Sequence, residues 1–146
     1  MKRIFAIVAL ATVALLGLQS CEKDDNYINE SLLPTEAQTF INTYFASVPI
    51  KNVIKDFDDF TYTYKVHLDD GTFIEFNKEG KWRDVKNHTT GVPNSIVPQK
   101  IVEYLTANYP NNFMADVERG RHYDVELNDG LDLDFSLDGD FLRIDR

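Results

Sequence analysis

Few side chains in this 146-residue sequence have the types and spacing that enzymatic chemistry requires. Cys21 is the only cysteine, and no Gly-x-Ser-x-Gly motif occurs, so neither a cysteine nor a serine nucleophile can be named. The three histidines, His67, His88 and His122, lack His-x-x-x-His spacing, and we interpret them as solvated side chains. The sequence therefore predicts a protein that is not an enzyme, with no catalytic residue, metal site or cofactor.

Carboxylates are abundant, and one segment places them with the ligand spacing of a calcium-binding loop. That segment runs from Asp134 to Asp145. Such a loop needs a helix on each side, whereas the residues around this segment alternate between apolar and polar, as in strands. We therefore interpret it as a hairpin that turns at Asp138-Gly139. No pair of carboxylates stands out as suited to glycoside hydrolysis.

Cys21 lies at the end of a secretory signal. Lys2 and Arg3 precede an apolar run over residues 4–16, which is too short to span a bilayer as a helix. The sequence Leu18-Gln19-Ser20-Cys21 resembles a lipobox, and the alternative is an ordinary secretory signal that contains a cysteine. We predict a lipoprotein signal peptide over residues 1–20, lipid on Cys21 and a tether over residues 21–30. The mature protein is then expected in the periplasm or at the cell surface, anchored by this lipid to the outer membrane.

The charge of the chain changes on processing. The precursor has 15 Lys and Arg against 24 Asp and Glu. Removal of residues 1–20 takes away Lys2 and Arg3, which leaves 13 against 24 and a net charge of −11. Phosphate repels a domain this acidic, so the sequence excludes nucleic acid as a partner and favours a basic one.

The mature chain contains two copies of one sequence unit. Tyr64–Gly71 matches Tyr123–Gly130 at an offset of 59 residues, whereas Pro34 matches Pro98 at an offset of 64. The first copy therefore carries five extra residues, which fall within 55–61. We predict one domain over 31–146, with repeat one at 31–86, a linker at 87–95 and repeat two at 96–146.

Each repeat is expected to form a helix followed by about four short antiparallel strands. Apolar residues recur at helical spacing after Pro34 and Pro98, and alternate at a period of two in the segments that follow. Asp70-Gly71 and Asp129-Gly130 are typical of hairpin turns. The predicted fold class is α+β, in which the two repeats share one antiparallel sheet with the helices packed on one face.

The same residues resemble a known family. Leu33-Pro34, the segment Tyr64–Gly71 and the Gly80-x-Trp82 motif are similar to the PepSY-like, β-lactamase-inhibitor-like lipoproteins of Bacteroidetes. The resemblance covers nearly the whole mature chain, and its motifs are mostly structural. It implies an exported protein with one open sheet face and a role in binding or inhibiting another protein, and it brings no catalytic residues.

Alternation along the strands predicts which side chains occupy the open face. Three aromatic residues, Phe73, Trp82 and Phe141, are expected there as anchors for a protein partner, together with Arg143. The alternative for Trp82 and Phe141 is that they cover the sheet beside a turn or point inward through a bulge. Two other functions remain open: a structural accessory lipoprotein of the envelope, or a small-ligand or calcium binder that uses the acidic turns.

Overall fold

A computed structural model describes residues 26–58 and 60–145 of the chain. The predicted signal peptide, Cys21 and most of the predicted tether lie outside these residues. Within the described part, no helix is long and apolar enough to cross a membrane.

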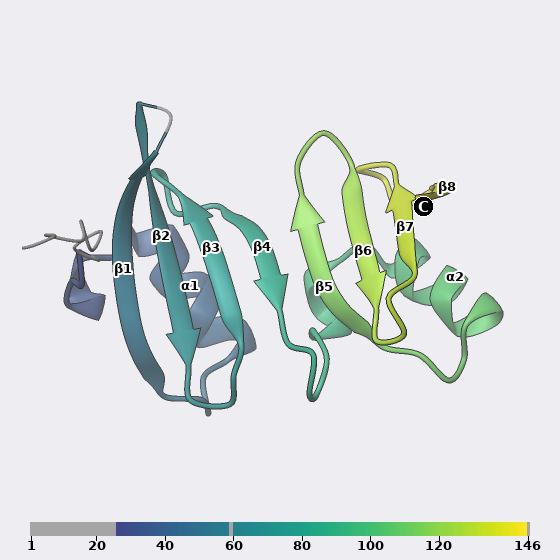
Figure 1. The fold of residues 1–146 in the computed structure, drawn as a ribbon, viewed down its shortest axis with the longest axis horizontal. Coiled ribbons are helices and arrows are strands. Elements are labelled where there is room, and N and C mark those ends of the chain that lie inside the picture. Colours follow the sequence, from purple (N-terminus) through teal and green to yellow (C-terminus); the bar gives the residue numbers. More distant parts are fainter. Residues whose placement is uncertain (1–25, 59, 146) are drawn as a thin grey trace, which may run out of the picture.

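Eight strands form a single antiparallel sheet whose spatial order is the order of the chain (Figure 1). Each strand pairs only with its neighbours in sequence; short turns connect β1 to β4 and β5 to β8, whereas the connection from β4 to β5 contains a helix. Apolar side chains alternate with polar ones along the strands, so one face is apolar and the other polar. The strands are β1 (Ile50–Asp58), β2 (Thr61–Leu68), β3 (Phe73–Asn77), β4 (Trp82–Lys86), β5 (Met114–Arg119), β6 (Tyr123–Leu127), β7 (Asp132–Phe135) and β8 (Phe141–Asp145).

Two ten-residue helices lie on the same face of the sheet, behind it in the view of Figure 1. They are α1 (Thr35–Tyr44), which precedes β1–β4, and α2 (Gln99–Asn108), which precedes β5–β8. A short 3₁₀ helix comes before each of them, η1 (Glu30–Leu32) and η2 (Asn94–Ile96). The expected α+β class, with one antiparallel sheet and both helices on one face, is confirmed.

Glycines in two turns hold the helices close to the sheet. Gly80 lies between β3 and β4 with a φ of 87°, and a Cβ there would lie 2.8 Å from the Cβ of Pro34. Gly139 lies between β7 and β8 with a φ of 88°, and its Cβ would lie 3.0 Å from the Cβ of Pro98. Only glycine combines this backbone conformation with so close an approach. Each turn therefore packs against the residue that precedes a helix.

The prediction that Trp82 and Phe141 lie on the open face of the sheet is wrong. The β3–β4 pairing shifts between Glu75 and Phe76, so that Phe76 pairs with Trp82 while Glu75 pairs with Asp84. One extra residue, Arg83, breaks the alternation and turns the Trp82 side chain toward the helices. Trp82 is only 8% exposed, and its ring lies 5.9 Å from that of Phe40 in α1.

Phe141 is displaced in the same way at the end of the sheet. The β7–β8 pairing shifts between Asp134 and Phe135, and Leu142 is the extra residue. The Phe141 ring stacks on Tyr104 of α2 at 4.5 Å with an interplanar angle of 9°. Both aromatic side chains therefore belong to the layer between sheet and helices, and neither offers an anchor on the open face.

Candidate functional site: the open face of the sheet

The face of the sheet opposite the helices, called the open face below, carries two rows of side chains that run across all eight strands. Strand register defines both rows, because residues paired across neighbouring strands point to the same side. The first row is Asn52, His67, Phe73, Lys86, Asp116, Glu126, Asp132 and Asp145, and the second is Ile54, Lys65, Glu75, Asp84, Glu118, Asp124, Asp134 and Arg143.

The open face is strongly acidic over β4–β7. Seven carboxylates from the two rows lie on these four strands, whereas Lys86 is the one Lys or Arg that the rows place there. Each of these positions follows from alternation with a buried neighbour such as Val85, Val117, Val125 or Leu133, all of which are fully buried. The open face over these strands therefore carries seven of the 24 Asp and Glu residues of the chain against one lysine.

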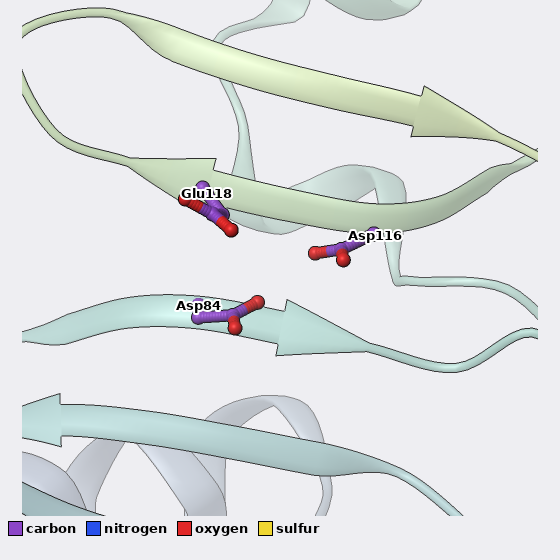
Figure 2. Close-up of side chains that lie close together, drawn as sticks. All are labelled: Asp84, Asp116 and Glu118. Carbon is purple, nitrogen blue, oxygen red and sulfur yellow. The ribbon is translucent and has the colours of Figure 1, made fainter. Parts of the chain in front are cut away.

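The centre of this surface is a cluster around Lys86. Asp84 on β4 faces Asp116 and Glu118 on β5, and Figure 2 shows the three carboxylates pointing into the space between the strands. The Lys86 ammonium lies 3.0 Å from Asp84, 2.6 Å from Asp116 and 3.8 Å from Glu118. The Lys86 ammonium is thus the shared ion-pair partner of three carboxylates.

The electrostatics of the cluster follow from this imbalance. Burial, together with a hydrogen bond and charge from Asp116, raises the pKa of Asp84 to about 7, although Lys86 acts in the opposite direction. Burial alone would lower the pKa of Lys86, but hydrogen bonds to Asp116 and Asp84 raise it above its usual value. One oxygen of Asp84 and one of Asp116 are buried and accept no hydrogen bond from any other described residue. The hydrogen bond between the two carboxyl groups requires that one of them is protonated.

A second group surrounds Asp134, whose side chain is only 2% exposed. Arg143 lies 2.6 Å from one carboxylate oxygen, and Nε2 of His122 lies 3.3 Å from the other. This second oxygen makes no hydrogen bond within the described part of the chain. Burial and the charge of Asp134 raise the pKa of nearby Asp124. Asp134 thus pairs with a guanidinium that is itself exposed at the surface of the open face.

The predicted anchors are not brought together. Phe73 lies on the open face, with its ring 5.1 Å from that of His67. Arg143 also lies on this face, but on β8, five strands away from β3, which is about 24 Å at the usual strand spacing. Asp134–Asp145 forms the β7–β8 hairpin, so the hairpin interpretation of that segment is confirmed.

Sequence reasoning missed Asp116 and Glu118. The signal was present, because Met114, Asp116, Val117 and Glu118 alternate with the period of a strand and Val117 matches Val53 at the offset of 64. The β4–β5 pairing that joins the two carboxylates to Asp84 spans the predicted linker. Nothing local in the sequence indicates that pairing.

With this fold and this acidic sheet face established, the chain can be assigned to a family. It belongs to the PepSY-like family, whose description reads "Putative beta-lactamase-inhibitor-like, PepSY-like" and which matches residues 62–143. That description names no enzymatic activity. A search of curated proteins returns no match.

Solved structures from Bacteroides species share the fold. One, from Bacteroides thetaiotaomicron, is described as a putative calcium-regulated periplasmic protein; it is 32% identical with a TM-score of 0.80, over 84% of this chain and 98% of that one. A putative periplasmic protein from Bacteroides vulgatus is 34% identical with a TM-score of 0.77, over 86% and 99%. Another from the same species is 32% identical with a TM-score of 0.78, over 84% and 99%.

Proposed function

We propose that this chain is an exported, lipid-anchored binding module whose open face binds another protein through basic side chains of that partner. The observation that carries the proposal is the acidic open face over β4–β7, where the two rows place seven carboxylates and Lys86 is the one Lys or Arg. Lysine and arginine side chains of a partner would form charge-assisted hydrogen bonds with these carboxylates and neutralise them.

The proposed location rests on the sequence and on the neighbours. The chain begins with a basic segment and an apolar run that end at Cys21. The similar Bacteroides proteins are described as periplasmic. We further propose that residues 31–86 and 96–146 are copies of one unit, which would explain why one helix precedes each set of four strands. The family description supports a test for inhibition as the consequence of binding.

Site-specific photo-crosslinking in intact cells of the native host tests the proposal. A photoreactive residue at Phe73 samples the open face, and one at Glu103, exposed on α2, samples the helix side of the same molecule. One protein is expected to be captured from position 73 and not from position 103. Capture of the same neighbours from both positions would instead favour a structural lipoprotein with no partner at the open face.

A matched pair of charge variants tests the chemistry. The double variant Glu118→Gln and Glu126→Gln removes two carboxylates from the open face, whereas Glu36→Gln and Glu103→Gln removes two from the helices. The first double variant is expected to lose the crosslink and the second to keep it, with binding that weakens as salt is raised. Equal effects of the two double variants would contradict recognition through the open face.

Calcium binding is a second candidate function, favoured by one specific observation. Asp84, Asp116 and Glu118 each offer an oxygen within 4.8 Å of the others, and a similar protein is described as calcium-regulated. The Lys86 ammonium lies at the centre of these carboxylates, so a calcium ion would have to displace it. Lys86→Met would therefore strengthen calcium binding, seen as a larger rise in melting temperature with added calcium than in the unmodified protein. If calcium moves neither melting temperature, this candidate fails.

A further inference from the structure

The hairpin formed by β1 and β2 ends in exposed aromatic side chains. Phe57, Phe60 and Tyr62, called the aromatic tip below, are 56%, 98% and 45% exposed. The rings of Phe57 and Tyr62 lie 4.8 Å apart, and Phe60 has a φ of 64°, which is unusual for a bulky residue. The hairpin rises above the β3–β4 turn in Figure 1. The Lys55 ammonium lies 4.3 Å from the centre of the Tyr62 ring, but Phe60 and Phe57 remain largely exposed, so the three rings are candidates for a contact outside the molecule.

The same end of the sheet carries a group of basic side chains. In an antiparallel meander the β1–β2, β3–β4, β5–β6 and β7–β8 turns share one end. The β7–β8 turn carries Asp138 and Asp140, so the basic group is confined to the part of this end nearer β3–β6. There a hollow of about 290 Å³ lies between the β3–β4 and β5–β6 turns. Its basic lining residues, called the basic hollow below, are Lys81, Arg83, Arg119 and Arg121, all exposed and none in an ion pair with a described residue.

Two turns at the opposite end of the sheet are acidic. They are Asp69-Asp70-Gly71 between β2 and β3 and Asn128-Asp129-Gly130 between β6 and β7. Neither contains a lysine or an arginine. The basic side chains of the hollow therefore have no counterpart in these two turns.

The N-terminal segment is directed toward the aromatic tip. Ile28 donates its backbone N–H to Val53, and Lys55 donates its backbone N–H to Asn26, so this segment lies antiparallel to β1. Moving from Ile28 back to Asn26 thus leads toward the β1–β2 turn. Cys21 is five residues before Asn26, a reach of at most about 18 Å. The three residues of β1 beyond Lys55 extend about 10 Å, so a lipid on Cys21 could insert level with the tip.

We propose that this end of the sheet faces the anchoring membrane, with the aromatic tip in the lipid–water interface and the basic hollow against anionic phosphate headgroups. The inference rests on the lipid anchor of the proposed function. Aromatic side chains favour the interface because their rings are apolar and their edges tolerate water. Asp58 and Asp59 are neighbours of the aromatic tip in the sequence and are negatively charged, so the tip itself is not attracted to anionic headgroups. The rings make the apolar contact with the interface, and the basic hollow supplies the electrostatic attraction to the headgroups. In this orientation the sheet stands upright on the membrane and both its faces remain accessible.

Depth measurements on the lipidated full-length protein test the orientation. The protein is reconstituted in vesicles of phosphatidylethanolamine and phosphatidylglycerol that contain nitroxide-labelled lipid. Acylation blocks Cys21, so a single introduced cysteine can carry a fluorophore. Phe60→Cys reports on the aromatic tip, Gly120→Cys on the β5–β6 turn, where a side chain meets nothing within 4 Å, and Asp129→Cys on the opposite end. Quenching is expected at positions 60 and 120 and not at 129.

Each outcome decides a different point. If the protein floats with the vesicles but position 129 is quenched as strongly as position 60, or if none is quenched, the anchor stands and the orientation is wrong. If the protein does not float with the vesicles, the lipid anchor fails and the orientation fails with it.

Charge variants test the basic hollow separately. Arg121→Glu is expected to lower the ratio of docked to undocked protein about fivefold for each unit of charge removed, seen as lost quenching at position 120. Lys51→Glu makes the same change of charge at the start of β1, on the opposite end, and should leave the quenching unchanged. Vesicles of phosphatidylcholine alone should also abolish the difference between the two variants. Equal quenching for Arg121→Glu and unmodified protein would overturn the headgroup contact.

Discussion

Replacing Asp84 by asparagine should stabilise the protein at neutral and alkaline pH. Asp84 lies in the cluster around Lys86 with a side chain that is 15% exposed. Its pKa of about 7 lies well above the ordinary value of 3.8, so the folded protein binds the Asp84 proton more tightly than the unfolded chain does. The stabilisation from this proton is complete below pH 4 and is lost as the pH rises toward 7 and beyond. Asparagine cannot ionise and keeps an oxygen that can accept from Lys86.

The size of the effect follows from the shift. A change of about three pKa units corresponds to roughly 4 kcal/mol at 1.36 kcal/mol per unit. The open face is in contact with water, and screening reduces the figure to about 1–2 kcal/mol. Asp84→Asn is therefore expected to raise the free energy of unfolding by about 1–2 kcal/mol at pH 8 and to change it little at pH 4.

Urea denaturation followed by the fluorescence of Trp82, the only tryptophan, measures this directly. The curves are recorded from pH 4 to pH 8 for the unmodified protein, Asp84→Asn and Asp138→Asn, the last being a control in the exposed β7–β8 turn. The difference between the unmodified protein and Asp84→Asn should grow with pH, and the control should run parallel to the unmodified protein. A variant that is less stable than the unmodified protein at pH 8, or whose difference does not change with pH, would refute the reasoning.

Three further predictions concern stability and use urea denaturation followed by far-UV circular dichroism, because Trp82→Ala removes the fluorescent probe. Trp82→Ala should cost about 3–5 kcal/mol because the ring is buried, and Phe141→Ala clearly less because that side chain is 37% exposed; equal losses would contradict the placement of the two rings. Gly80→Ala should cost well over the roughly 1–2 kcal/mol expected for Gly71→Ala, since both have a positive φ but only the Cβ at position 80 meets a neighbour. Arg143→Ala should cost about 1–3 kcal/mol by leaving a buried carboxylate without its guanidinium, and an unchanged midpoint would count against that pair.

Much of the architecture could be predicted from the sequence because the determining signals are local. Apolar residues at helical spacing after Pro34 and Pro98 predict the helices, and Asp-Gly turns between alternating segments predict the hairpins. The five extra residues inferred within 55–61 fall in the β1–β2 hairpin, where β1 has nine residues and β5 has six.

The errors in assigning side chains to a sheet face arose where one extra residue in a strand reverses the alternation of side-chain directions. Alternation assigns Trp82 and Phe141 to the open face, but the bulges at Arg83 and Leu142 reverse the direction of every side chain that precedes them on the strand. A bulge leaves almost no trace in a single sequence. The acidic centre of the open face was missed for another reason, since it depends on the pairing of β4 with β5 across 27 intervening residues. Such a pairing is long-range, and no local sequence pattern specifies its register.

The order of the strands has a consequence for how the protein acquires its structure. A chain that emerges N-terminus first, from a ribosome or through a membrane, presents β1 to β4 in the order in which they pair. By the time Lys86 has emerged, every ladder among these four strands can form, and α1 is already available to cover them. Pairing between neighbours in sequence carries a small cost in loop-closure entropy and is therefore fast. The second set of strands can then grow from the free edge of β4, so that assembly proceeds by extension of an existing template rather than by a search among distant segments.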